Sequence, residues 1–397
     1  MKKLFYKIIA LLMNFSIHSN TQIIREVSAL EFAQFNPLAD VLQCTKDYQF
    51  NFKPYPLYSE HAQECFPNRG LYQDIYIAKI PNGIANFCSC DNFWGINGLI
   101  FINNYFIKEC QIKDISPFYL HKTNIIQIQK TSNNYYIDGS LAICSHIYSD
   151  FYGHFIQDVL SQLALLEIYN IEYDYLCIPY NKNYMQETLE LWGIDKQKII
   201  SLEFNRTIQA QSIILPTSTT QTKNIFKWAN YNNDFIIKYI QQKLLSNAKK
   251  LYPNFSSNCK KIFISRKDSA RNNPRITPNE DEIFNIFKQH GFETYDFTKL
   301  NFTKKILLLN NAEQVASFVG SGALNIIFCK PNTKYIELVQ QSFEAGNFYL
   351  TNILNLDYYV IDNSTINDFW NHYTTTPARH FPIEIIYDFF KNHSEIG

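Results

Sequence analysis

The chain has 397 residues, with 36 basic and 36 acidic side chains and a formal net charge of zero. This length can bury more than one core, and the even charge excludes a general binder of nucleic acids or anionic surfaces. The nine cysteines include no Cys-x-x-Cys pair, which excludes a zinc ribbon, and we expect reduced, partly buried thiols.

The first 140 residues carry the weakest signals. Residues 1–16 have a basic start and an apolar run from Ile8 to Met13 that is too short to cross a bilayer. We interpret this segment as an amphipathic leader, with a signal-like or membrane-surface helix as the alternative. Residues 22–140 scatter proline, glycine and aromatic residues among short apolar runs such as 99–102 and 125–128, which predicts an irregular region with several short strands.

A helix is predicted over residues 153–168, where apolar residues recur at helical spacing. Its predicted buried stripe consists of Phe155, Val159, Leu163 and Leu166. His154 and Asp158 lie one turn apart on a neighbouring face, so the carboxylate can orient the imidazole. Such a pair can act as a general base, but a structural histidine bonded to the aspartate of its own helix explains the spacing about as well.

Strands and helices then alternate. Strands are predicted at 173–179, 198–202 and 212–215, with a helix at 184–191 that ends at Gly193. The first lobe is therefore expected to be α/β. A long helical pattern from residue 226 to about 251 leads into the second lobe, and we expect the aromatic tail after Gln340 to pack back across the first lobe.

The stretch from Lys261 to Val339 gives the clearest pattern. Strands are predicted at 261–266, 292–297, 315–319 and 335–339, with helices between them, including a short one at 323–328. Thr277-Pro278-Asn279-Glu280 is the pattern of a capping box that starts the first of these helices. This alternation predicts a parallel, Rossmann-like sheet.

Polar and glycine residues occur at or near the carboxyl ends of these strands. Arg266 follows the first strand, Gly320 and Gly322 follow the third, and Glu337 lies in the fourth. Such groups suit a nucleotide: a guanidinium grips phosphate, glycines let backbone N–H groups approach it, and a carboxylate accepts from ribose hydroxyls. The alternatives are that any tight turn needs these glycines and that a nearby arginine pairs with Glu337.

These residues carry a resemblance to a known family. The segments that match in order and approximate spacing are Gly153 to Leu160, Ile264-Ser265-Arg266, Arg275, Asn279-Glu280, Gly291-Phe292-Glu293, Gly320-Ser321-Gly322-Ala323-Leu324-Asn325, Phe328, Pro331 and Ile336-Glu337-Leu338. Between about residues 141 and 340 the chain resembles glycosyltransferase family 61. That resemblance implies an inverting transferase of GT-B-like fold that uses a nucleotide-sugar, commonly a UDP-sugar, without an Asp-x-Asp metal site.

The sequence departs from the family pattern at one position. Many members carry a histidine just before the glycine of the turn after the third strand, where this chain has Ser321. The donor-phosphate contact that the resemblance gives to that histidine therefore passes to backbone N–H groups and Ser321, or is lost. Arg275 and Glu280 also have simpler explanations, as a solvated loop cation and as part of the capping box.

We therefore expect an α/β chain of two Rossmann-like lobes, residues 1–225 on the acceptor side and 226–397 on the nucleotide-sugar side. The expected catalytic residues are His154 and Asp158. The expected donor-binding residues are Arg266, Arg275, Gly320, Ser321, Gly322, Asn325 and Glu337. No metal or cofactor is expected; the partners are a nucleotide-sugar donor and a glycan or glycoconjugate acceptor, with no nucleic acid.

Other functions and locations stay open at this stage. A catalytically silent glycan-binding homologue and a pyruvyl-type transferase of polysaccharide assembly are the alternatives to a glycosyltransferase. We expect a cytoplasmic chain, with peripheral membrane association or a secretory-pathway lumen as the alternative locations.

Overall fold

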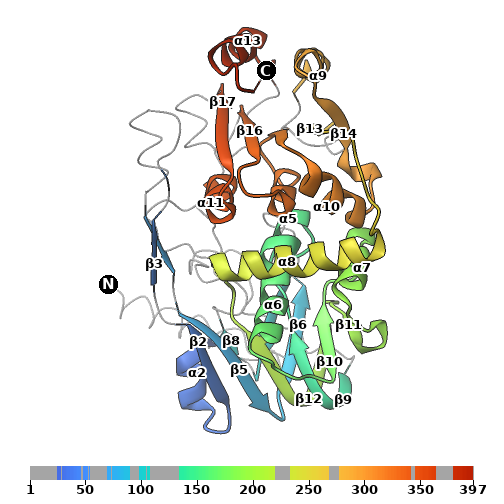
Figure 1. The fold of residues 1–397 in the computed structure, drawn as a ribbon. Helices are drawn as coiled ribbons and strands as arrows, with labels where there is room; N and C mark the ends of the chain where they lie inside the picture. The colour runs from blue at the N-terminus through green and yellow to red at the C-terminus, as the bar shows by residue number, and fades with distance from the viewer. Residues whose placement is uncertain are drawn as a thin grey trace, which may run out of the picture.

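The computed structural model describes residues 25–27, 29–45, 48–51, 53, 69–72, 74–89, 98–103, 105–107, 134–219, 233–267, 277–340, 345–363 and 379–396. These residues form a mixed ten-stranded sheet, a parallel five-stranded sheet and a separate strand pair. Figure 1 shows the two large sheets one above the other, with helix α8 crossing between them. The predicted α/β class is confirmed.

The ten-stranded sheet is built from the first half of the chain. Its strands are β1 (Arg25–Val27), β2 (Asp40–Thr45), β5 (Ile75–Pro81), β6 (Ile84–Ser89), β7 (Gly98–Ile102), β8 (Tyr105–Ile107), β9 (Asn134–Ile143), β10 (Tyr175–Ile178), β11 (Ile199–Ser201) and β12 (Arg206–Pro216). Strands β3 (Tyr48–Asn51) and β4 (Arg69–Tyr72) pair separately. The helices of this half are α2 (Ala29–Phe35), α5 (Tyr152–His154), η2 (Phe155–Val159), α6 (Leu160–Ile168), α7 (Asn183–Trp192) and η3 (Lys196–Lys198).

Only part of this sheet has the predicted Rossmann-like pattern. Strands β12, β9, β10 and β11 are adjacent and parallel; helices connect β9 to β10 and β10 to β11, whereas β11 continues to β12 without a helix. Strands β5 and β6 from the region predicted to be irregular instead add antiparallel pairs to β12. The first sheet is therefore mixed. The predicted short strand at 99–102 is confirmed as part of β7, and residues 125–128 lie outside the described residues.

The five-stranded sheet confirms the predicted parallel arrangement. Its strands run in the order β14 (Glu293–Asp296), β13 (Lys261–Ser265), β15 (Gln314–Phe318), β16 (Lys334–Val339) and β17 (Asp357–Asp362). Its helical segments are α9 (Glu280–Gln289), η4 (Phe297–Lys299), α10 (Phe302–Asn311), η5 (Ala323–Phe328), α11 (Ala345–Leu354) and α13 (Ile383–Asn392), with α8 (Asp234–Leu251) preceding β13. The local sequence patterns do not predict α11 or β17.

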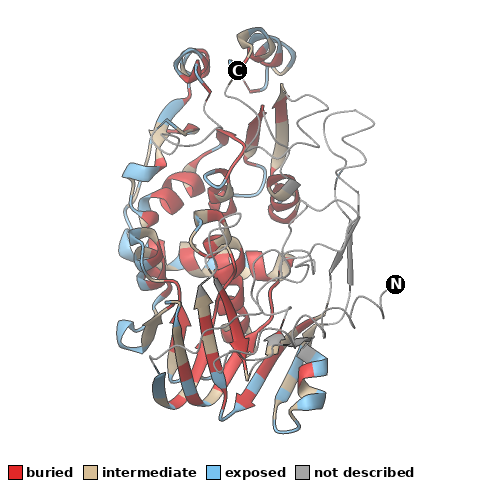
Figure 2. Ribbon diagram, turned by 180° about the vertical axis from the view of Figure 1, so that it is seen from behind, coloured by how far each residue is buried: buried red, intermediate tan, exposed pale blue. Residues whose placement is uncertain are grey.

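One hydrophobic cluster joins the facing sides of the two sheets. It includes Ala142 and Leu176 of the first sheet, Ile262 and Val315 of the second, and Ile240 of α8 between them. Side chains alternate along the buried strands, so Phe263 points away from this cluster into another one on the far face of the second sheet. Figure 2 shows the buried residues concentrated along the strands and the helices between the sheets.

The end of the chain packs differently from the expectation. Phe390 of α13 contacts Phe287 of α9, with ring centroids 5.1 Å apart, and both belong to the cluster on the far face of the second sheet. This helix therefore covers the second sheet and does not cross the first one, because its apolar face packs against α9 and β17. Phe369 and Trp370, and the expected lobe boundary at residues 225 and 226, lie outside the described residues.

Two further expectations bear on the chain as a whole. Cys144, Cys177, Cys259 and Cys329 are buried free thiols, as expected, and burial raises the pKa of each. In the part of the chain that the structure describes, no helix combines the length and apolar character needed to span a membrane.

The shared core predicts cooperative unfolding of both sheets. Ile240 is fully buried in α8 and belongs to the cluster that joins the two sheets. We expect Ile240→Ala to lower the free energy of unfolding by about 2–5 kcal/mol, because it leaves a cavity in this core. The exposed Gln242→Ala on the same helix is the control and should change stability by less than about 0.5 kcal/mol.

Urea unfolding followed by fluorescence and by far-UV circular dichroism would measure this effect. We expect one transition that shifts as a whole in Ile240→Ala. Two separate transitions, only one of which moves, would show that the sheets unfold independently.

Candidate active site

The candidate site lies where the strand order of each sheet changes direction. In the parallel part of the first sheet, β9 has β10 on one side and β12 on the other; in the second sheet, β13 lies between β14 and β15. Crevices at the carboxyl ends of such strands are the usual ligand sites of α/β sheets. The chain segments that leave these ends carry His146 and His154 in the first sheet, and Arg266 and Gly320 in the second.

The predicted pair of His154 and Asp158 is present. The segment from Tyr152 to Ile168 is continuously helical, with one π-helical stretch at Phe155–Val159 that contains Asp158. Its predicted apolar stripe is fully buried. The His154 Nδ1 lies 2.7 Å from the Asp158 Oδ2. Because an ionised carboxylate only accepts hydrogen bonds, His154 carries its proton on Nδ1 and leaves the Nε2 lone pair available.

Exposure separates the two members of the pair. The side chain of Asp158 is 3% exposed, whereas that of His154 is 32% exposed. The carboxylate is thus enclosed by protein, while the imidazole can reach a ligand. This arrangement is the one that a general base and its orienting carboxylate require.

A second histidine, which the sequence analysis did not single out, stacks on His154. The ring centroids of His146 and His154 are 4.9 Å apart and the rings are nearly parallel, at 13°. Burial lowers the pKa of His146 to about 4, despite the opposing effect of the nearby Asp158 charge, so this ring is neutral near pH 7. The available signal was its place just after a buried strand, but residues before 140 were interpreted as irregular and β9 was missed.

His146, His154 and Asp158 are also the group that comes nearest to a metal site. Among the described residues, their potential ligand atoms lie within 4.8 Å of one another. A metal ion needs imidazole lone pairs that converge, and these lone pairs lie in the ring planes. Because the two rings are stacked, their lone pairs do not point at a common position, and one ring would have to turn to bind the ion.

Arg266 lies beside the glycine turn, as the sequence predicted for the end of β13. Its guanidinium donates to the Val319 carbonyl, and a Cβ on Gly320 would lie 3.1 Å from the Arg266 Cζ. Gly320 also has a φ of +142°, which L-residues rarely adopt. Glycine is therefore required at this position both by the backbone conformation and by the neighbouring guanidinium.

The predicted capping box does not form. The Thr277 hydroxyl donates to the Gln340 Oε1, and α9 begins at Glu280. The Glu280 Oε1 instead accepts from the Arg266 backbone N–H at 2.9 Å and from the Ser265 hydroxyl at 3.3 Å. Burial raises the pKa of Glu280, and these hydrogen bonds oppose the increase. Glu280 thus fixes the end of β13 that carries Arg266, whereas Arg275 lies outside the described residues.

The turn after β15 offers its first residues to a ligand. Ser321 and Gly322 are exposed. The N–H groups of Ala323, Leu324 and Asn325 already donate to carbonyls of the same turn. A phosphate would compete with these hydrogen bonds at the three N–H groups, and the predicted contacts of Ser321 and Gly322 stay predictions.

Asn325 is buried and holds the turn in place. Its amide donates to the Gly322 carbonyl at 2.7 Å, and its Oδ1 accepts from the Tyr152 hydroxyl at 2.5 Å. Tyr152 directly precedes the Gly153-His154 pair, so this hydrogen bond ties the histidine helix to the glycine turn. The predicted donor contact of Asn325 stays a prediction.

Glycine 153 lets the two predicted parts of the site touch. A Cβ at this position would lie 2.9 Å from the Leu324 Cδ1 and 3.1 Å from the Ser321 Oγ. A larger residue at position 153 would therefore force these side chains to shift. Two segments that are distant in the sequence meet here, so the predicted catalytic and donor-binding groups border one site.

Glu337 is enclosed beneath the second sheet's inner face. It is 1% exposed, and its carboxylate accepts from the Asn347 amide and the hydroxyls of Tyr335 and Tyr358. These donors come from β16, β17 and α11, so the carboxylate anchors α11 to the sheet. Its predicted contact with ribose stays a prediction, and this contact would compete with the three donors.

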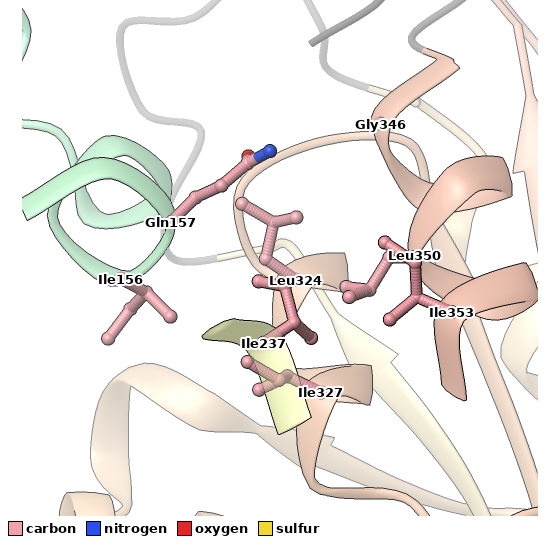
Figure 3. Close-up of a pocket in the computed structure, with 8 residues that line it drawn as sticks. All are labelled: Ile156, Gln157, Ile237, Leu324, Ile327, Gly346, Leu350 and Ile353. Carbon is pink, nitrogen blue, oxygen red and sulfur yellow. The ribbon is translucent and has the colours of Figure 1, made fainter. Parts of the chain in front are cut away.

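An apolar pocket adjoins the site (Figure 3). The residues that line it come from η2, α8, η5 and α11: Ile156, Gln157, Ile237, Leu324, Ile327, Gly346, Leu350 and Ile353. Its volume of 20 Å³ has room for about one water molecule and not for a sugar. This pocket is therefore not the predicted donor site.

The fold and the site define an α/β protein whose parallel strand ends bring a histidine–aspartate pair next to an arginine and a glycine turn. Residues 152–336 match the model of the family described as Glycosyltransferase 61. This match confirms the resemblance found in the sequence and indicates glycosyltransferase activity, with a sugar donor and an acceptor as substrates. The search of curated proteins gave no match.

The matched range covers only part of the candidate site. It begins at Tyr152 and therefore includes His154, Asp158, Arg266 and the glycine turn. It leaves out His146, and it ends one residue before Glu337.

Substitution of Glu280 tests how Arg266 is positioned. Glu280→Gln keeps an oxygen that accepts from the Arg266 N–H, so we expect stability equal to or slightly above that of the wild type, since no buried charge remains. Glu280→Ala leaves the buried donor without its acceptor and should cost about 1–3 kcal/mol. Chemical denaturation of both variants measures the difference; equal losses would contradict the role of Glu280 as an acceptor.

The lowered pKa of His146 predicts a pH dependence of stability. The unfolded chain binds a proton at this histidine near pH 6.5 and the folded chain only near pH 4. Stability is therefore complete above about pH 6.5 and is lost as the pH falls towards 4, by roughly 3 kcal/mol for this group. Phenylalanine cannot titrate, so the free energy of unfolding of His146→Phe should fall by that much less than that of the wild type between pH 6.5 and 4. Parallel curves of this free energy against pH for the two proteins would contradict the assignment of the effect to His146.

Proposed function

We propose that this protein is an inverting glycosyltransferase that moves a sugar from a nucleotide-sugar, a UDP-sugar by the family resemblance, to a hydroxyl of a glycan or glycoconjugate. The observation that carries the proposal is the close approach of Gly153 to Ser321 and Leu324. It brings a half-exposed imidazole with a buried carboxylate next to a turn and a cation that suit a diphosphate.

In the proposed reaction His154 is the general base. Its Nε2 takes the proton of the acceptor hydroxyl while the hydroxyl oxygen bonds to the anomeric carbon of the sugar. The bond from that carbon to the phosphate oxygen breaks on the opposite face, which inverts the configuration and releases the nucleoside diphosphate. Asp158 accepts from His154 Nδ1 at 2.7 Å and stabilises the imidazolium that forms.

The donor diphosphate is proposed to bind at the second sheet. Arg266, Ser321 and Gly322 would contact the phosphates, and Gly320 would keep the turn close to the guanidinium. Contacts of Arg275 with phosphate and of Glu337 with ribose belong to the same proposal. The cation and the backbone N–H groups would stabilise the leaving diphosphate without a metal ion.

One observation favours a second candidate function. Ser321 stands where the resemblance places a histidine, and a serine supplies no positive charge to a leaving phosphate. The alternative is a catalytically silent homologue that binds glycans. It would bind an acceptor without transferring a sugar to it.

The decisive experiment measures thermal stability of the purified chain against nucleotides and nucleotide-sugars, with and without Mg²⁺ or Mn²⁺. A ligand that binds only the folded state at 100 times its Kd stabilises it by about 2.7 kcal/mol. An increase in Tm with UDP or a UDP-sugar in the presence of EDTA would support the proposal and identify the donor. No increase with any nucleotide would favour the glycan-binding alternative.

Three variants separate donor binding from chemistry. Arg266→Ala should weaken binding of the donor nucleotide at least about tenfold, because a charge-assisted contact is lost. His154→Ala and Asp158→Asn should lower kcat by about 10²-fold or more and leave donor affinity nearly unchanged. Isothermal titration and assays of released nucleoside diphosphate measure the two effects.

Matched controls lie close by. Lys267→Ala removes an exposed cation beside Arg266 that pairs with Asp281, and His380→Ala removes an exposed histidine elsewhere. Both should bind and turn over the donor like the wild type. Wild-type turnover in His154→Ala would rule out this histidine as the base.

A further inference from the structure

His146 lies in the loop directly after β9 and is almost fully buried. It is 6% exposed and follows β9 by three residues. The preceding N–H, that of Ser145, donates to the Gln162 side chain at 2.6 Å, and the His146 carbonyl accepts from the Ser149 N–H at 3.0 Å. These hydrogen bonds fix the backbone of the segment that carries the ring.

The hydrogen bonds of His146 determine which nitrogen carries its proton. The Tyr148 backbone N–H donates to the His146 Nδ1 at 3.2 Å, so this nitrogen is unprotonated in the neutral ring and Nε2 carries the hydrogen. The His146 Nδ1 lies 3.8 Å from the Asp158 Oδ2, beyond hydrogen-bonding distance. Asp158 therefore orients His154 and makes no hydrogen bond to the His146 Nδ1.

The contact between the two rings limits how His154 can move. One hydrogen bond from Nδ1 to Asp158 leaves the imidazole able to swing about its side-chain bonds. A flat ring stacked on one face, at 4.9 Å and 13°, blocks that motion. The Tyr148 ring also contacts the His154 ring, with the two ring centroids 5.1 Å apart.

We propose that His146 is a positioning residue: its stacked, uncharged ring holds the His154 imidazole so that Nε2 faces the crevice beside Ser321. The catalytic part of this inference rests on the proposed function, since it concerns the base of that reaction. A second requirement follows from the charge that His154 gains. An imidazolium is repelled by a neighbouring cation but attracted by the face of a neutral aromatic ring, so the stacked partner has to stay uncharged.

The charged and titratable groups around His146 agree with this role. Asp158 and His154 come from the helix that packs over it, and Tyr148 from its own loop. Burial opposes a charge on His146 more strongly than the Asp158 carboxylate favours one. The ring thus stays neutral near pH 7.

Two substitutions separate the effect of the stacked ring from the effect of the hydrogen bond that His146 accepts from the Tyr148 N–H. His146→Phe keeps a flat ring against His154 but cannot accept from the Tyr148 N–H. His146→Asn keeps an acceptor close to the position of Nδ1 but removes the ring. If stacking is the function of His146, the tautomer and reactivity of His154 stay as in the wild type in His146→Phe and change in His146→Asn. If His146 only holds its loop, they change in His146→Phe and stay as in the wild type in His146→Asn.

The first measurement is independent of any enzymatic activity. Nitrogen-15 NMR of histidine-labelled protein at pH 7 reports which nitrogen of His154 carries the proton. We expect the Nδ1–H form in the wild type and in His146→Phe, and a mixture of both tautomers in His146→Asn. The rate at which diethyl pyrocarbonate modifies His154, followed by peptide mass mapping, should change at least about threefold in His146→Asn only.

The second measurement uses the donor found by thermal stability. His146→Asn should lower kcat about tenfold or more with an unchanged KM for the donor, and His146→Phe should stay within about threefold of the wild type. Melting temperatures of both variants show whether they fold. If Asn does not fold, His146→Gln, which also keeps an acceptor without a ring, takes its place.

The outcomes are separable. A wild-type tautomer and reactivity of His154 in His146→Asn would overturn the positioning role, whether or not the protein transfers sugars. Tight stoichiometric binding of Zn²⁺ that is lost in both His146 variants would overturn it in favour of a metal site. The predicted NMR result without any transfer activity would support the positioning of His154 while the proposed function failed.

Discussion

The contact between Gly153 and the turn at Ser321 to Leu324 is the constraint on which the candidate site depends. A Cβ at residue 153 would lie 2.9 Å from the Leu324 Cδ1, so a larger residue would force the Leu324 side chain to shift. The Tyr152 hydroxyl donates to Asn325 of the turn, and His154 follows Gly153 directly in the sequence. The shared core beneath, with α8 between the sheets, keeps both partners in place.

Three buried carboxylates show how similar residues serve different purposes. Burying a carboxylate is costly unless donors surround it. Glu337 meets this requirement with Asn347 and two tyrosines, and Glu280 with the Arg266 N–H and Ser265, so each carboxylate holds neighbouring elements together. The ribose contact of Glu337 stays a prediction. Asp158 alone pairs with a half-exposed imidazole that can take up a proton. Chemistry is expected where the partner of a buried charge is itself accessible and titratable.

The predictions that succeeded concern short distances along the chain. The spacing of His154 and Asp158 places their side chains on adjacent turns of one helix, and the structure has them hydrogen-bonded. Arg266 directly follows β13, which ends at Ser265, so its predicted place at the carboxyl end of a buried apolar strand is confirmed to within one residue. The predicted capping box does not form because the Thr277 hydroxyl donates to Gln340, 63 residues away in the sequence. Local sequence patterns do not reveal such a distant partner. His146 was missed for a related reason, since its meaning depends on the ring that stacks on it.

The sequence by itself determined the parallel order of the second sheet, the helix that carries His154 and the family resemblance, because hydrophobic periodicity and helix or turn signals act over a few residues. Only the tertiary structure decided that the glycine turn and Gly153 touch, that His146 stacks on His154, and that Glu280 and Glu337 are occupied by internal donors. These contacts join residues far apart in the chain, and their partners are selected by shape and by the need to satisfy buried polar groups.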